Sequence, residues 1–283
     1  MSIRIICDSA SDIAAEKARD WKVTVLPIKT IFGDQEYLDG VTMSHKEFYE
    51  KLIETDELPK TSQISPFDYE EAFKEVVEAG DTAICITLSS KLSGCYQSAH
   101  IAAQEFKDQI MIVDSENVCI GEQLLVELAV QLREEGKTAG EIVSILNQEK
   151  KNIRLIALLD TLEYLKKGGR ISATAAFAGT LLSIKPVITI TEGEIAMLGK
   201  ARGSKNGSNM LIRLVEEEGG INLNKPINVA YSGLSDDCLQ KYLQDSKKLY
   251  EGKEGSLPIC TIGSTIGTHV GPGAIAAAFF VNQ

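Results

Sequence analysis

Residues 83–99, AICITLSSKLSGCYQSA, contain the pattern that decides the fold: a strand, a polar turn and a helix. Residues 83–88 are short, apolar and β-branched, as in a buried parallel strand. Ser93 stands where the N-cap of a helix over residues 96–106 is expected, with Gly94 beside it. A helix N-terminus offers unpaired N–H groups to an anion, and glycine lets a ligand atom approach the backbone. The turn therefore predicts an anion site, but a capped βα turn without any ligand has the same pattern.

Strands and helices alternate on both sides of this stretch. Apolar strands are expected over residues 3–7, 23–28 and 110–113, and helices over residues 11–20, 44–54, 66–79, 117–135 and 138–150. A hairpin turning at Gly33-Asp34 is expected within residues 29–43. This alternation predicts a mainly parallel sheet with helices on both faces, where ligands bind at the carboxyl ends of strands. The polar pairs Asp8-Ser9 and Asp114-Ser115 fall at such ends, as residues 89–94 do.

The second half of the chain has a different pattern. Strands are expected over residues 154–158, 227–231, 257–262 and 274–281, with a hairpin through Gly193. Residues 173–182 are small and apolar, which permits close approach of a backbone or a slender ligand, and GTHVGPG at residues 267–273 predicts a glycine-rich loop. We therefore expect two α/β domains, residues 1–155 with a parallel sheet and residues 156–283 with a mixed sheet. Segments near residues 60–80 are expected to cross to the second domain.

Composition excludes several classes of function. The net charge of −11 argues against nucleic-acid binding, which favours basic surfaces. The six cysteines include no CxxC pair and there are only three histidines, so we expect no metal site and reduced thiols in a cytoplasmic protein. Charge is nevertheless uneven: residues 166–205 carry seven basic and two acidic side chains, a net +5 that leaves −16 for the rest. Such a basic patch suits an anionic ligand or an acidic partner surface, or it is a solvated face of mixed charge.

The sequence contains no complete motif of a known catalytic site. Ser93 lies outside any GxSxG elbow, and a Ser93–His269 pair has no evident third member, although a serine hydrolase or transferase remains the alternative. No Walker loop or GxGxxG follows a strand. Binding fits better, because the hydroxyls of Thr61, Ser62 and Ser93 beside two helix N-termini suit a carboxylate. An apolar tunnel between the domains is expected to hold an alkyl chain, with wall candidates Leu162, Leu165, Ile171, Phe177, Leu181 and Ile184.

A set of motifs in fixed order also resembles the DegV family. The motifs are CDS at residues 7–9, PKTSQ at 59–63, LSSKLSGCYQSA at 88–99, VDS at 113–115, LEYLKKGGRI at 162–171, KP at 185–186 and HVGPG at 269–273. The family comprises bacterial fatty-acid-binding proteins, some of which are the acyl-carrying subunit of a fatty acid kinase. The resemblance implies a carrier without catalytic activity, and a ligand such as palmitate, stearate or oleate with no further cofactor.

The resemblance also implies roles for particular residues. Thr61, Ser62, Ser93 and Gly94 would hold the fatty acid carboxylate, while Arg170, Arg202 and His269 would lie at the tunnel mouth where a kinase subunit approaches. We expect transient membrane contact during loading and no nucleic-acid partner. The sequence departs from the family at Cys95, where members often carry threonine or serine.

Overall fold

The chain forms two α/β units and a small projecting arm, seen in a computed structural model that describes residues 2–55, 57–106, 108–171, 184–253 and 255–282. The expectation for residues 173–182, including Phe177 and Leu181, lies outside the described residues. The first unit contains a parallel sheet in the order β2-β1-β6-β7. Its strands are β1 (Ile3–Asp8), β2 (Val23–Leu26), β6 (Thr82–Thr87) and β7 (Ile110–Asp114).

The second unit contains a mixed sheet in the order β10-β9-β8-β13-β11-β12. All of its neighbouring pairs are antiparallel except β11 and β12. The strands are β8 (Ile153–Leu158), β9 (Ile184–Thr191), β10 (Glu194–Arg202), β11 (Ile227–Tyr231), β12 (Ile259–Thr261) and β13 (Ile275–Phe280). One parallel and one mixed sheet confirm the predicted fold class.

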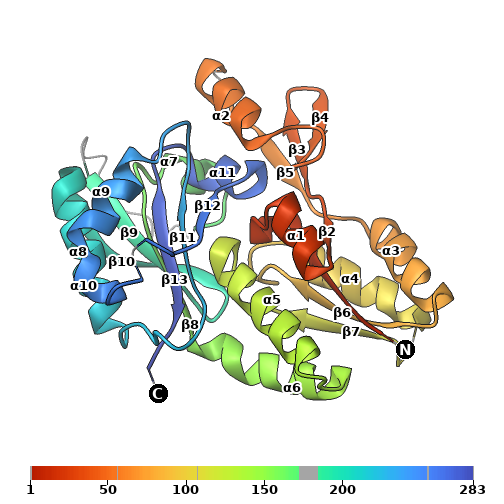
Figure 1. Cartoon of the computed structure of the whole chain (residues 1–283). Coiled ribbons are helices and arrows are strands. Elements are labelled where there is room, and N and C mark those ends of the chain that lie inside the picture. Colours follow the sequence, from red (N-terminus) through yellow and green to blue (C-terminus); the bar gives the residue numbers. More distant parts are fainter. Residues whose placement is uncertain (1, 56, 107, 172–183, 254, 283) are drawn as a thin grey trace.

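The helices cover the sheets in layers (Figure 1). Around the first sheet lie α1 (Ala15–Trp21), α3 (Pro66–Glu78), α4 (Cys95–Ala103), α5 (Cys119–Glu134) and α6 (Ala139–Glu149). With the second sheet are α7 (Glu163–Lys167), α8 (Gly203–Glu217), α9 (Asp237–Asp245), α10 (Lys247–Tyr250) and α11 (Ser264–Val270). Helix α5 contacts β1 and β6 on one side and β8, β11 and β13 on the other. It is therefore buried between the sheets, which explains why most of its side chains are apolar and enclosed.

The arm is a three-stranded antiparallel sheet that carries a helix and projects from the two units (Figure 1). Its strands are β3 (Lys29–Phe32), β4 (Gln35–Leu38) and β5 (Lys60–Ser62), and its helix is α2 (His45–Glu54). The predicted turn at Gly33 joins β3 to β4, where the glycine has a φ of +56°. Helix α2 begins with the reciprocal bonds of a capping box between Ser44 and Glu47. Strand β5 pairs with β3, so Thr61 lies opposite Thr30.

Two local expectations were wrong. Helix α4 begins at Cys95 with Gly94 as N-cap, so Ser93 precedes the cap position, although its hydroxyl still accepts a bond from the Cys95 N–H. Of the glycine-rich loop expected over residues 267–273, residues 267–270 belong to helix α11 (Ser264–Val270), and only residues 271–273 lie outside it. Carboxylates from the first unit and the arm bind the N–H groups at the start of this helix, a stabilisation that its sequence alone does not reveal. Within the described residues no helix is long and apolar enough to cross a membrane.

Candidate ligand-binding site

A cavity of about 310 Å³ lies where the arm, the first unit and the second unit meet. Its polar lining comes from β5, the turn after β6, the segment after α7 and helix α11. Its apolar lining consists of Ile28, Leu88, Leu92, Val118, Leu165, Ile195, Ile266 and Val270. The structure thus brings together Thr61, Ser62, Ser93, Gly94, Arg170 and His269 around one hollow. Such a mixed cavity suits a ligand with a polar group and an apolar body.

Gly94 permits a close contact on the polar side. An added Cβ at Gly94 would lie 1.9 Å from the Gln63 Oε1, so a larger residue would displace that amide. Gln63 lines the cavity, and its amide donates to the Ser98 hydroxyl over 3.0 Å. This bond joins the segment after β5 to helix α4. Glycine therefore allows the Gln63 amide to lie against the backbone at the start of α4 and to reach Ser98.

Ser93 is placed by its bonds to Cys95. The Ser93 hydroxyl donates to the Cys95 sulfur and accepts from the Cys95 N–H, each over 3.3 Å. Burial, followed by the charge of Asp8, raises the pKa of the Cys95 thiol to about 12, so the sulfur is a neutral thiol at pH 7. A sulfur is a weak acceptor, and the Ser93 O–H can turn from it to a stronger one such as a carboxylate oxygen.

His269 is in hydrogen-bond contact with Thr61 in the lining of the cavity. The His269 Nε2 lies 3.0 Å from the Thr61 Oγ1, and the buried Nδ1 has no hydrogen-bond partner within the described part of the chain. Burial, followed by the positive charge of Arg170, lowers the pKa of His269 to about 4. The imidazole is therefore neutral at pH 7, like the hydroxyls beside it, and Arg170 is the charged group among the described lining residues.

Arg170 lies at the outer edge of the cavity. It is exposed, and its guanidinium donates to the backbone oxygens of Leu92 over 3.4 Å and Gly168 over 2.7 Å. An adjoining open hollow is lined by Ser93, Gly94 and Arg170 together with Lys91 and Glu194. The cavity therefore opens toward solvent beside Arg170.

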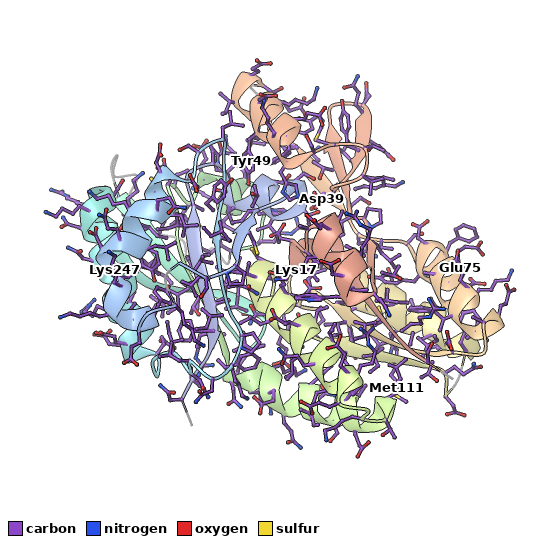
Figure 2. The ribbon with its side chains drawn as sticks, in the orientation of Figure 1. Lys17, Asp39, Tyr49, Glu75, Met111 and Lys247 are labelled. Atoms are coloured by element: carbon purple, nitrogen blue, oxygen red, sulfur yellow. The ribbon has the colours of Figure 1, made fainter. Side chains whose placement is uncertain are left out.

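Helix α11 is fixed by residues that the sequence analysis missed. Asp39 accepts from the N–H of Ser264 over 2.9 Å and of Thr265 over 3.2 Å, and Asp12 accepts from the N–H of Gly263 over 2.7 Å. In Figure 2, Asp39 and Tyr49 lie on the side of the arm that faces this helix, and the Tyr49 hydroxyl donates to the Ile262 oxygen. The partners lie more than 200 positions apart, so no local pattern predicts them.

Other expected residues lie elsewhere. Arg202 ends β10 and is exposed, and it is not among the described residues that line the cavity. Ile171 lines the adjoining open hollow and also belongs to the hydrophobic core, against which Leu162 packs.

The hydrolase alternative requires a Ser93–His269 pair, but in the described residues each side chain is bonded elsewhere, Ser93 to Cys95 and His269 to Thr61. No described carboxylate orients the imidazole of His269 through its Nδ1. The geometry therefore gives no support to a catalytic triad at this site.

The fold and the cavity define a class: an α/β protein of two units that share one amphipathic cavity. The chain belongs to the DegV family, since the model described as "Uncharacterised protein, DegV family" matches residues 2–282. A DegV domain-containing protein of Clostridium perfringens is 35% identical, with 97% of this chain and 96% of that protein covered.

Two solved structures extend the comparison. A DegV family protein from Thermus thermophilus, described for its fatty acid binding, is 31% identical with a TM-score of 0.87, covering 99% of this chain and 100% of its own. A stearic-acid-binding protein from Eubacterium ventriosum is 27% identical with a TM-score of 0.89, covering 99% and 98%.

Proposed function

We propose that this protein is a cytoplasmic carrier that binds one long-chain fatty acid, such as palmitate, in the shared cavity. Thr61, Ser62, Ser93 and the Gly94 backbone bind its carboxylate, and the apolar wall surrounds its chain. The observation that carries the proposal is the single cavity that combines these hydroxyls with an apolar lining from both units. Each methylene removed from water contributes about 0.8 kcal/mol, so a long chain gives tight binding.

The fatty-acid-binding relatives support the ligand class. The six free cysteines suit a reducing compartment, which supports the cytoplasmic location.

The bound acid is presented to a separate kinase subunit at the mouth beside Arg170, and His269 lies between the mouth and the headgroup. Arg202 extends the basic surface that the kinase contacts. Loading proceeds through transient contact with a membrane. Support for the mouth comes from the open hollow beside Arg170 and from its exposed guanidinium.

The test is denaturing extraction of the purified protein followed by mass spectrometry, together with palmitate and oleate uptake by delipidated protein. A released or bound fatty acid in about equimolar amount is the expected result. A protein that is empty as purified and that takes up neither acid contradicts the proposal.

Substitution of the hydroxyl sharpens this test. Ser93→Ala should weaken palmitate binding by about 1–3 kcal/mol, because a hydrogen bond to a charged carboxylate is lost. Ser90→Ala is the matched control, since Ser90 is an exposed residue in the same turn and does not line the main cavity. Equal affinities of the two variants would remove Ser93 from the headgroup site.

Arg170→Ala should keep palmitate binding and lower phosphorylation by a kinase partner, and unchanged phosphorylation would reject its role at the mouth.

A further inference from the structure

A second cavity, of about 90 Å³, lies in the second unit and shares no lining residue with the first. It is formed where the ends of β8 and β9 meet the first turns of α8 and α9. Its polar lining contains three lysines and two hydroxyls: Lys185, Lys205, Lys241, Ser204 and Ser208. Three lysines from three separate elements therefore line one small hollow.

The charges around this hollow are not balanced. Lys185 forms an ion pair with Asp160, which is the carboxylate among the described lining residues. Lys205 and Lys241 are exposed and form no ion pair with any described residue. Three positive charges thus face one negative charge, and the net charge of +2 matches a dianion.

The start of helix α8 adds to this field. Its N-cap residue, Arg202, makes no side-chain capping bond, and the first turn of α8 contains no acidic residue. The positive φ of +72° at Gly203 turns the chain into the helix beside the cavity. Ser204 and Lys205, which line the cavity, belong to that first turn, whose N–H groups have no intrahelical partner.

We propose that this cavity binds one phosphate group, either free phosphate or the phosphate of a small monoester. The small volume of this hollow and its net charge of +2 suit one tetrahedral oxyanion. Lys205 and Lys241 supply the charge, the Ser204 hydroxyl donates a hydrogen bond, and the Asp160 carboxylate stays paired with Lys185. The proposal is independent of fatty acid binding in the first cavity.

The rate at which Cys238 is alkylated reports directly on whether an anion occupies this cavity. It lines this cavity and is exposed, whereas the other five cysteines are buried. Alkylation of Cys238 by N-ethylmaleimide is followed by mass spectrometry at fixed pH and ionic strength, with inorganic phosphate titrated against chloride. Bound phosphate should slow alkylation saturably, because it blocks the thiol and disfavours its thiolate. Glycerol 3-phosphate forms the second arm, and the more protective of the two anions identifies the source of the phosphate.

Variants decide whether the effect belongs to this cavity. Lys205→Gln and Lys241→Gln should each weaken phosphate protection about tenfold, which corresponds to the loss of one charge-assisted contact. Lys247→Gln is the matched control, because Lys247 is an exposed lysine of α10 that does not line the cavity (Figure 2). Palmitate uptake should be unchanged in all three variants, so it reports on the first cavity separately. The proposal is overturned if phosphate at tens of millimolar does not slow the alkylation of Cys238, or if it slows alkylation equally in all variants.

Discussion

Asp39→Asn should destabilise the protein because one carboxylate of the arm holds the start of α11. Asp39 is 4% exposed, and its two oxygens accept from the N–H of Ser264, the N–H of Thr265 and the hydroxyl of Ser9. The Ser264 bond uses one oxygen, whereas the other two bonds share the second. Asparagine has the same shape, but an NH₂ group replaces one of these oxygens.

The magnitude follows from this division. If the amide oxygen keeps the two shared bonds, the NH₂ group faces the Ser264 N–H, a buried donor left without an acceptor. An unsatisfied buried donor costs about 1–3 kcal/mol, and the remaining two bonds lose the assistance of a charge. The opposite amide orientation leaves the Thr265 N–H unpaired, while the Ser9 hydroxyl can turn to the Thr265 hydroxyl 3.4 Å away. We therefore expect the free energy of unfolding to fall by about 2–4 kcal/mol.

The assay is urea unfolding at pH 7, with Asp34→Asn as the control. Asp34 lies in the same arm, is exposed, and makes the same charge change when replaced, so its variant should stay within about 0.5 kcal/mol of the parent. Palmitate affinity should also fall in Asp39→Asn, because α11 contributes Thr265, Ile266 and His269 to the cavity. Equal stability of both variants would refute the view that Asp39 fixes this helix.

Two further predictions concern the same region. Gly271→Ala should lower the free energy of unfolding by about 1–3 kcal/mol more than Gly136→Ala. Both glycines have positive φ, but an added Cβ at Gly271 would lie 2.3 Å from the Tyr164 ring, whereas at Gly136 it would meet nothing within 4 Å. The pKa of His269 is lowered to about 4, so the unfolded state binds more protons than the folded state below pH 6.5, and stability falls as the pH falls. Urea unfolding should show that the parent loses about 2 kcal/mol more than His269→Gln between pH 7 and pH 5, and parallel losses would contradict the neutral imidazole.

Local signals predicted local structure well. The capping boxes that begin at Ser44 and Thr138 form as expected, because both partners lie within one turn of the chain. The arrangement of strands into a parallel and a mixed sheet followed from the change of pattern near residue 155, although the division into domains at that residue stays a prediction.

The candidate site was predicted unevenly. Thr61, Ser93 and His269 do meet around one cavity. Hydroxyl chemistry predicted a carboxylate site for Thr61 and Ser93, whereas His269 was added to it only by the resemblance of separate motifs. The helical state of residues 264–270 was missed because its stabilising partners, Asp12 and Asp39, lie far away in the sequence. Arg202 was placed at the mouth by the resemblance and by the basic patch. It is exposed and is not among the described lining residues of the cavity, so its contact with a partner stays a prediction.

The electrostatics of the site bear on the proposed hand-over of the fatty acid. A carboxylate bound by hydroxyls and a neutral imidazole has no cation in direct contact with its oxygens, whereas a buried ion pair would hold those oxygens and cost about 3–5 kcal/mol to break. The nearest guanidinium, that of Arg170, is exposed and is bonded to backbone oxygens. It lowers the pKa of His269 across the cavity and so helps to keep the imidazole neutral. On the proposed function, this division leaves the headgroup nucleophilic for phosphorylation while the positive charge at the mouth faces the approaching kinase.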